Sequence, residues 1–474
     1  MTDAPATTSD STSSSERLPA AEVRVSMMRV ITAWGFGSVF FTTLGGPIYT
    51  AFVRSLSTDD RLYGLLAAAL PMMSFLQVVA ARKIERTGKR KRPMVVNGLI
   101  SRSLWIVAAL LPLLWVWAPQ TFSKSAIFWM VLCAIAGSSV FQALAGTAFF
   151  SWMGDLVPER VRPTFFARRM QVGYATAIAV SLGAGIIADR WNTLPVLCVI
   201  LALAACAGVV DIAMFFGVRE PPASPEFQPS QESFWASLLP PLRDAATRQF
   251  LIFSSLLAVG YGFNGPFVTL HAMENLQLSK TVTGLVIVIA PLLGMVWSLN
   301  FWKNAIRAHG TRPVMRLCSM GLLVAPVGWL LAQPHQWLII AAISFTSGVM
   351  AGGIELCNQT LLTGLSPWVP RPTLIALFSI ASGISFALAS ICGGLLAQFL
   401  RGTNPSLFGF ALLPYHVLFL LSLLIRIVNS FVVAPRLQEP DASSTLDTVR
   451  EIIPELAQNF ASLITRPLSK KEEI

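Results

Sequence analysis

Long apolar stretches alternate with short polar connections from about residue 28 to residue 433. A helix that crosses a bilayer needs about 20 mostly apolar residues, and about twelve stretches meet that need. They lie near residues 28–53, 62–81, 94–117, 126–153, 165–188, 194–217, 248–272, 280–301, 314–332, 337–363, 373–399 and 407–433. The pattern predicts an all-α membrane protein with about twelve transmembrane helices.

Short motifs recur about 220 residues apart, in the same order along the chain. The repeated motifs are Gly46-Pro47 with Gly265-Pro266, Gly64-Leu65 with Gly284-Leu285, Pro71 with Pro291, and Arg162-Pro163-Thr164 with Arg371-Pro372-Thr373. Motifs that recur in order at matching places of the hydropathy pattern indicate an internal duplication. We therefore expect two pseudo-symmetric bundles of six helices each.

The polar segments predict the limits of these bundles. Residues 1–25 are rich in Ser and Thr and predict a disordered tail, followed by a first bundle over residues 26–217. Residues 218–247 are rich in proline and predict a linker, and residues 248–434 predict the second bundle. Residues 435–474 form a polar tail whose apolar positions recur every three or four residues. This spacing predicts an amphipathic helix that lies on the membrane or docks on a partner.

Composition and charge agree with a membrane protein. The chain is 54% hydrophobic and 12% charged, whereas soluble domains carry roughly 25% charged residues. Lys and Arg gather in the loops on one side, which predicts that both termini are cytoplasmic. Arg162, Arg168 and Arg169 belong to this set and are expected at the lipid headgroups. This asymmetry accounts for the net charge of +11 without a nucleic-acid partner.

The loop after the second predicted helix carries the most specific motif, from Ala81 to Arg90. It is similar to the pattern Gly-x-Leu-Ala-Asp-Arg-x-Gly-Arg-Arg/Lys of the major facilitator superfamily of secondary transporters. Gly88 matches the turn glycine, Glu85 replaces the aspartate and Ala81 replaces the first glycine. The resemblance covers about residues 25–435 and is to bacterial members of the family, which implies the inner membrane of a bacterium. It also implies that Glu85, Gly88 and Arg90 hold a cytoplasmic gate shut. The alternative is a loop that is merely positively charged.

Polar residues inside the predicted helices are the candidates for substrate and proton binding. Glu355 lies about eight residues inside one end of the helix at 337–363, with Asn358 and Gln359 on the same face. An ionisable residue at such a depth is costly and therefore a functional hypothesis, here a proton-coupling site. The alternative is a structural hydrogen bond to a neighbouring helix.

The resemblance implies that the first, fourth, seventh and tenth helices line a central cavity. Further candidates on those helices are Ser38, Thr42, Gln142, Tyr261, Asn264 and His271. Gly46-Pro47 and Gly265-Pro266 are expected to act as helix hinges. Arg102 and Asp211 lie at similar depths on helices that the resemblance makes peripheral, and we expect a structural ion pair between them.

No motif points to an enzyme, a cofactor or a metal. The chain has no HExxH, phosphate loop or GxSxG, its four histidines are scattered, and its six cysteines lie in apolar stretches without a CxxC pair. We therefore predict a monomeric secondary active transporter that moves a small polar or organic solute by alternating access, coupled to protons. The alternatives are a translocase of lipids or amphipaths and a sensor of the same descent that transports nothing.

Overall fold

The computed structural model describes residues 19–158, 161–221, 241–364, 371–403, 406–407, 410–411 and 413–437, together with residues 452 and 454. Most of the predicted N-terminal tail, linker and C-terminal tail, including its amphipathic helix, lies outside these residues. The side chains of a few residues within the ranges, among them Glu85, are also not described.

The first half of the chain is a series of long helices, two of which are interrupted, one by a break after Leu44 and the other by a 3-10 turn at Met73–Phe75. It contains α1 (Ala20–Leu44), α2 (Pro47–Leu56), α3 (Asp60–Met72), the 3-10 turn η1 (Met73–Phe75), α4 (Leu76–Thr87), α5 (Lys91–Trp117), α6 (Lys124–Leu156), α7 (Arg162–Arg190), α8 (Leu194–Met214) and the 3-10 turn η3 (Phe215–Gly217).

The second half is helical in the same way, with three π-helical turns. It contains α10 (Ala245–Leu270), the π-helix η4 (His271–Asn275), α11 (Lys280–Gly284), the π-helix η5 (Leu285–Ile289), α12 (Ala290–His309), α13 (Thr311–Gly321), α14 (Val324–Leu331), α15 (Trp337–Gly364), α16 (Arg371–Leu400), β1 (Ser406–Leu407), β2 (Phe410–Ala411), α17 (Pro414–Val428), the π-helix η6 (Asn429–Val433) and the 3-10 turn η7 (Ala434–Arg436). Strands β1 and β2 form one short antiparallel pair.

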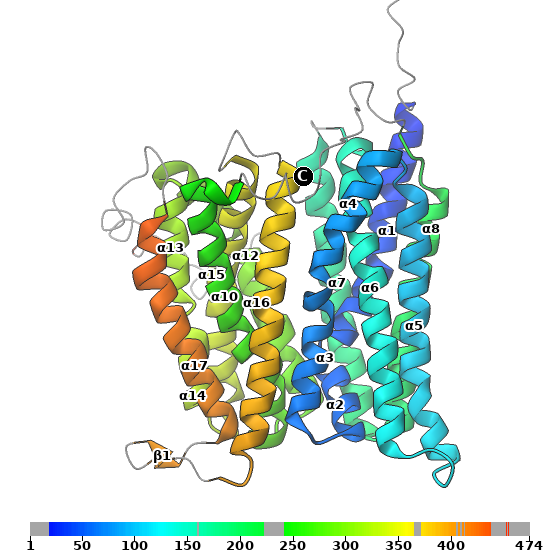
Figure 1. The fold of residues 1–474 in the computed structure, drawn as a ribbon, viewed down its shortest axis with the longest axis vertical. Helices are drawn as coiled ribbons and strands as arrows, with labels where there is room; N and C mark the ends of the chain where they lie inside the picture. The colour runs from blue at the N-terminus through cyan, green and yellow to red at the C-terminus, as the bar shows by residue number, and fades with distance from the viewer. Residues whose placement is uncertain are drawn as a thin grey trace, which may run out of the picture.

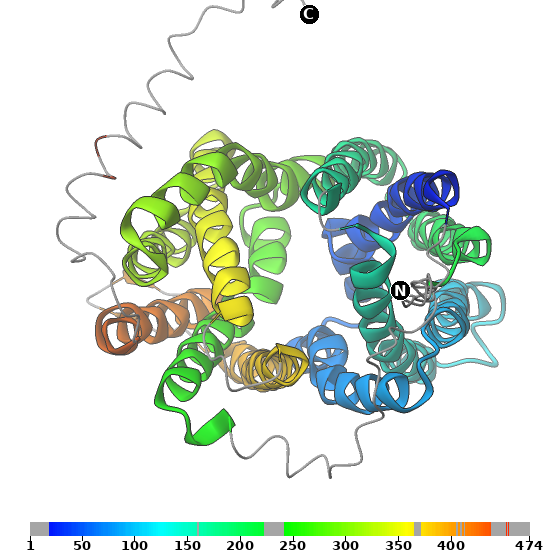
Figure 2. The same cartoon turned by 90° about the horizontal axis from the view of Figure 1, so that it is seen from above.

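Twelve helical segments in the described part of the chain are long and apolar enough to cross a membrane. They form two bundles that stand side by side, α1–α8 in one and α10–α17 in the other (Figures 1 and 2). The prediction of an all-α membrane protein with two six-helix bundles is confirmed.

Two helices of the structure differ in extent from the prediction, and in both cases a proline marks the new helix start. The stretch at 28–53 is divided, since α1 ends at Leu44 and α2 begins with Pro47 in its first turn. The last stretch was expected to begin at residue 407, but α17 begins at Pro414. Proline favours the first position of a helix because its nitrogen has no hydrogen to donate and its φ angle is already helical.

The repeated proline at 266 leaves its helix unbroken. Helix α10 runs through Gly265 and Pro266 to Leu270. Pro266 cannot donate to the carbonyl of Gly262, and the hydroxyl of Ser390 donates to that carbonyl instead, at 3.3 Å. A neighbouring helix therefore satisfies the backbone group that the proline leaves free. A hinge role for either Gly-Pro pair stays a prediction.

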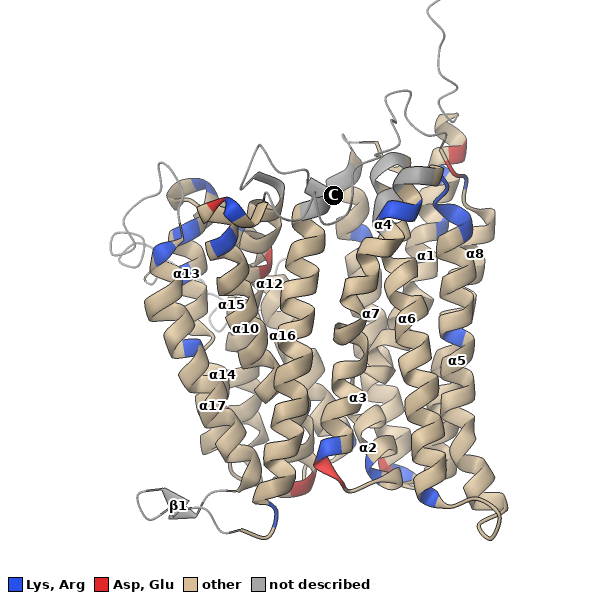
Figure 3. Ribbon diagram, in the orientation of Figure 1, with Lys and Arg blue, Asp and Glu red and all other residues tan. Residues whose placement is uncertain are grey.

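Lys and Arg gather at one end of the two bundles (Figure 3). We call this end, where α4 leads into α5 and α12 into α13, the basic end, and the opposite end the far end. The first bundle meets the second through α3 against α16 and through α7 against α11. A Cβ atom on Gly64 would lie 2.4 Å from the carbonyl oxygen of Ser390, and one on Gly383 would lie 2.6 Å from that of Pro71. Glycines thus allow α3 and α16 to pack backbone against backbone.

Candidate functional site

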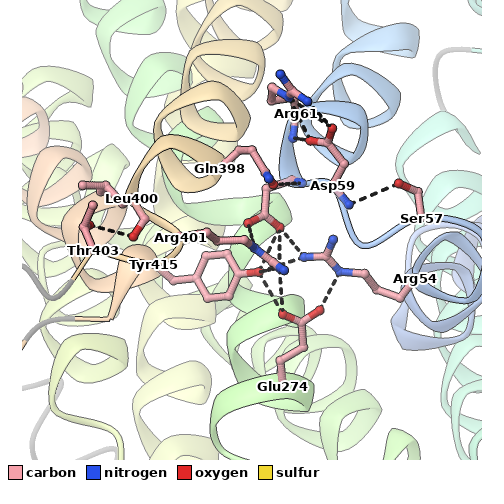
Figure 4. A network of polar contacts seen from close by, with 11 residues as sticks. Arg54, Ser57, Asp59, Arg61, Glu274, Gln398, Leu400, Arg401, Thr403 and Tyr415 are labelled. Carbon is pink, nitrogen blue, oxygen red and sulfur yellow. Dashed lines mark hydrogen bonds and ion pairs between the residues drawn. The ribbon is translucent and has the colours of Figure 1, made fainter.

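Five polar side chains join the two bundles at the far end (Figure 4). Arg54 from α2 and Asp60 from α3 come from the first bundle. Glu274 from η4, Arg401 after α16 and Tyr415 from α17 come from the second. We call these five residues the far-end network.

Asp60 is the centre of the far-end network. Its side chain is fully buried, and it accepts hydrogen bonds from Nε of Arg401 at 2.6 Å, from Nη2 of Arg401 at 3.1 Å and from the Tyr415 hydroxyl at 3.1 Å. Arg54 also donates to it. Glu274 completes the charge balance, with an oxygen 2.5 Å from Nε of Arg54 and another 3.4 Å from Nη2 of Arg401. Two arginines thus face two carboxylates, and the network is neutral.

Helix ends hold these charges in place. Asp60 lies in the first turn of α3, where the helix dipole favours an acid, and the neighbouring Asp59 caps the helix by accepting from the Arg61 backbone at 2.8 Å. Arg401 follows the last turn of α16, where the dipole favours a base. Burial alone would lower the pKa of Arg401, but its hydrogen bonds to Asp60 and Tyr415 raise it on balance.

A second polar contact joins the bundles through α7 and α11. Asp189, near the end of α7, accepts from the backbone nitrogens of Lys280 at 2.8 Å and of Thr281 at 2.9 Å. The Thr281 hydroxyl donates to the same carboxylate at 2.7 Å. Asp189 therefore caps the start of a helix that belongs to the other bundle.

Glu355 has an exposed side chain on α15 and accepts a hydrogen bond from Gln359 at 3.0 Å. Its carboxylate interacts electrostatically with the phenol groups of Tyr174 on α7 and Tyr261 on α10. Because Tyr174 belongs to the first bundle and Tyr261 to the second, Glu355 faces the space between the bundles. Glu355 thus has Gln359 as a hydrogen-bond partner and interacts with Tyr261 and Tyr174. A role of these residues in substrate or proton binding stays a prediction.

The other candidates of the second bundle are less accessible. The ring of Tyr261 is also covered by the guanidinium of Arg426, at 4.4 Å. Asn264 is buried, and its side-chain oxygen and that of Asn358 find no hydrogen-bond partner in the described structure. His271 is fully buried among aromatic rings, 5.1 Å from the ring of His416, and its Nδ1 lies 3.0 Å from the Asn275 amide nitrogen. His271 therefore packs inside the second bundle and does not line the space around Glu355.

The candidates of the first bundle lie on α1 and α6. Ser38 is buried and donates to the carbonyl of Trp34 at 2.8 Å, while Thr42 is half-buried one turn further on. Gln142 accepts a hydrogen bond from Nη1 of Arg102 at 2.7 Å. Gln142 is therefore held by the arginine, and its role toward a solute stays a prediction.

The expected ion pair between Arg102 and Asp211 differs from what the structure contains. Both side chains are buried, but in the described structure no nitrogen of Arg102 comes as close to a carboxylate oxygen of Asp211 as an ion pair requires, which is 4.0 Å. Arg102 instead bonds Gln142 and lies over the ring of Phe40 at 3.8 Å. The aromatic face and the amide contact the guanidinium that the sequence assigned to the acid, and its Nε has no hydrogen-bond partner within the described residues.

The predicted gate residues lie at the basic end. Gly88 ends α4 with a φ of 64°, a left-handed conformation that glycine adopts without strain. Arg90 is buried, and its backbone nitrogen donates to the Glu220 carboxylate at 2.5 Å. Glu85 lies in α4, and its side chain is outside the described part. A gating role for these residues stays a prediction.

The sequence analysis did not find the far-end network. Its members come from segments up to 361 residues apart, so no local motif contains them. The available signal was the charge pattern, because Arg54, Asp60, Glu274 and Arg401 stand at helix ends on the side that carries few charges.

Comparisons with known proteins agree with this architecture. The family model described as Major Facilitator Superfamily matches residues 31–270 and again residues 250–469. A search of curated protein sequences finds no match.

Solved transporter structures share the fold at low sequence identity. The chain is similar to the nucleoside transporter NupG (TM-score 0.62, 11% identity, 88% of this chain and 99% of that one). It is also similar to a D-xylose-proton symporter (TM-score 0.64, 12% identity, 88% and 99%). A bacterial homologue of the human lysosomal transporter Spinster, in an inward-facing and unoccupied conformation, matches with a TM-score of 0.60 and 15% identity over 92% of this chain and 99% of that one.

Proposed function

This chain belongs to the major facilitator superfamily, and we propose that it moves a small polar or organic solute across its membrane by alternating access, coupled to protons. The membrane-spanning fold and the family support a solute transporter. One observation carries the finer proposal: the bundles are joined at the far end, while the ionisable Glu355 faces the space between them.

The charge asymmetry supports an orientation for this state. Because Lys and Arg gather at the basic end, we assign that end to the cytoplasm, in a bacterial inner membrane. The far-end network and the Asp189 cap then close the outer side. In this proposal the structure is an inward-facing state, and the opposite state requires these contacts to break.

Glu355 is the proposed coupling residue. A carboxylate that reaches the space between the bundles can exchange protons with water. Its neighbours Gln359, Tyr174 and Tyr261 offer polar groups that hydrogen-bond a carboxyl or a solute. Protonation would then be linked to the change of state.

Replacement of Glu355 by Gln tests the coupling, since it keeps the shape and hydrogen bonding and removes titration. The purified protein is reconstituted in liposomes and screened for uptake of sugars, organic acids and nucleosides with and without a pH gradient. For the solute that is taken up, Glu355→Gln should reduce gradient-driven accumulation at least tenfold and leave solute exchange within twofold of the wild type.

The matched control is Glu22→Gln, which removes an exposed carboxylate paired with Arg219 outside the space between the bundles. It should transport like the wild type. If Glu355→Gln still accumulates solute in a pH-dependent way, Glu355 does not couple transport to protons. If no tested solute enters liposomes beyond the rate of empty vesicles, the transport proposal itself is rejected for these solute classes.

A further inference from the structure

We propose that a pocket inside the first bundle binds a small hydroxycarboxylate anion. The pocket lies between α1, α5, α6, α7 and α8 and has a volume of about 200 Å³. Its polar lining consists of Trp34, Arg102, Gln142, Arg169 and Asp211. This proposal rests on the proposed function, because it names the class of solute that the transporter would take.

The charged groups of the pocket are buried and attract one another, but no ion pair or hydrogen bond joins them among the described residues. Arg102 is 2% exposed and Asp211 is 5% exposed. The carboxylate of Asp211 accepts no hydrogen bond from any residue in the described ranges, and it lines the pocket. A buried carboxylate without a hydrogen bond is costly. The pocket therefore contains an acceptor that a ligand could satisfy.

The guanidinium of Arg169 also has N–H groups that are available to a ligand. Its guanidinium lies over the ring of Trp34 at 3.8 Å and over that of Phe149 at 5.0 Å. Its Nε has no hydrogen-bond partner within the described structure. The aromatic rings orient the guanidinium without using its N–H groups, so these can bind a carboxylate in a bidentate way.

The charge balance favours an anion. Arg102 and Arg169 supply two positive charges and Asp211 supplies one negative charge, so the pocket has a net charge of about +1. A monocarboxylate would make the filled pocket neutral, whereas a zwitterion or a neutral solute would leave the excess charge buried. Because an uncompensated buried charge is expensive, the anion should bind best.

The unpartnered Asp211 adds a requirement for a hydrogen-bond donor on the ligand. A hydroxyl group donates to a carboxylate without changing the net charge, but an ammonium group would restore the excess of +1. Size sets a further limit, since a cavity of about 150 Å³ holds a benzene-sized molecule. A pocket of about 200 Å³ therefore suits a ligand of about six to ten non-hydrogen atoms.

Four compounds of similar size test the need for a negative charge and the need for a hydroxyl group separately. Binding of 3-hydroxybutanoate, butanoate, 3-aminobutanoate and 1,3-butanediol to the full-length detergent-solubilised protein is measured by isothermal titration calorimetry. We expect 3-hydroxybutanoate to bind at least tenfold more tightly than each of the other three. Equal or tighter binding of the diol or of 3-aminobutanoate would overturn the charge argument, and equal binding of butanoate would overturn the role of the hydroxyl group.

A steric variant locates the site without removing a charge. A Cβ atom on Gly146, which lines the pocket, meets nothing within 4 Å, so Gly146→Leu extends into the empty space without a clash at its Cβ. We expect it to weaken 3-hydroxybutanoate binding at least tenfold. Gly183 on α7 also has free space around its Cβ but does not line the pocket. Gly183→Leu is the matched control and should bind like the wild type.

A charge variant tests the anion contact. Arg169→Gln should weaken 3-hydroxybutanoate binding at least tenfold, while Arg169→Lys should recover part of the loss. Arg168 is the exposed neighbour of Arg169 on the same helix, and Arg168→Gln should have no effect. If both Gly146→Leu and Arg169→Gln bind 3-hydroxybutanoate like the wild type, the pocket is not the binding site.

The binding assay also separates this inference from the proposed function. If liposomes take up another solute under a pH gradient and 3-hydroxybutanoate does not bind, the transport proposal stands and the assignment of this pocket is wrong. If 3-hydroxybutanoate binds with the expected sensitivity to Gly146→Leu but is not transported, the pocket assignment stands and the transport proposal fails for this solute.

Discussion

The far-end network predicts a defined response to the loss of one charge. Asp60→Asn keeps the size of the side chain but leaves Arg54 and Arg401 facing only Glu274. Breaking a buried ion pair costs about 3–5 kcal/mol. Asp60 is fully buried, but the side chains of Arg401 and Glu274 are 34% and 35% exposed, so water compensates part of the loss. We therefore expect a cost of about 2–3 kcal/mol to the state in which the far end is closed.

This cost translates into a change of populations. Each 1.4 kcal/mol changes an equilibrium constant tenfold, so Asp60→Asn should shift the ratio of far-end-open to far-end-closed protein by roughly 30- to 140-fold. Ser181 on α7 is a suitable reporter, because it is buried near Gly284 of the other bundle. In a background without the native cysteines, Ser181→Cys is labelled with a membrane-impermeant maleimide in oriented vesicles, and the labelling rate should rise by this factor.

Two further variants make the test specific. Asp59→Asn changes the neighbouring carboxylate, which bonds Arg61 and not the far-end network, and it should label like the parent protein. Asp60→Asn combined with Arg401→Gln restores neutrality, so its effect should be smaller than the sum of the two single effects. Equal labelling of the Asp60→Asn and Asp59→Asn proteins would refute the reasoning.

Two glycine substitutions give further predictions. Gly64→Ala would place a Cβ atom 2.4 Å from the Ser390 carbonyl oxygen, so it should separate α3 from α16 and raise labelling of Ser181→Cys at least fivefold. Gly146→Ala, whose Cβ meets nothing within 4 Å, should leave the labelling unchanged. Gly88→Ala forces alanine into a φ of 64° and should lower the free energy of unfolding by about 1 kcal/mol. Gly88→Asn should recover part of this loss, since asparagine tolerates that conformation. An unchanged melting temperature in Gly88→Ala would contradict the claim that this backbone conformation strains alanine.

The fold could be predicted because each transmembrane helix leaves its own signature. A stretch of apolar residues long enough to span the bilayer is visible without its neighbours. The errors occurred where proline sets a local boundary, at Pro47 and at Pro414. At Pro266 the outcome depended on Ser390, which donates to the carbonyl of Gly262 from 128 residues further along the chain. Such a partner cannot be identified from one helix.

The candidate sites depended more strongly on distant partners. The depth of Glu355 in its helix identified it as a candidate, because an ionisable residue there is costly, but its exposed side chain could not be read from one helix. His271 was placed on the same cavity by its spacing on the helix, yet His416, Tyr415 and Trp329 surround its ring. Helical spacing determines the face of a residue, but the packing of the other helices determines whether that face is open.

The pocket of the first bundle shows why pairing charges by depth is insufficient. Arg102 and Asp211 lie at similar depths, but Gln142 and the ring of Phe40 compete for the guanidinium. Arg169, which the sequence placed at the lipid headgroups, turns onto Trp34 and brings a second positive charge to the same pocket. Three charges cannot neutralise one another in pairs, so one positive charge remains for an outside group to balance. The burial cost that makes a charged residue in a membrane rare therefore makes this unbalanced group a site for a charged solute.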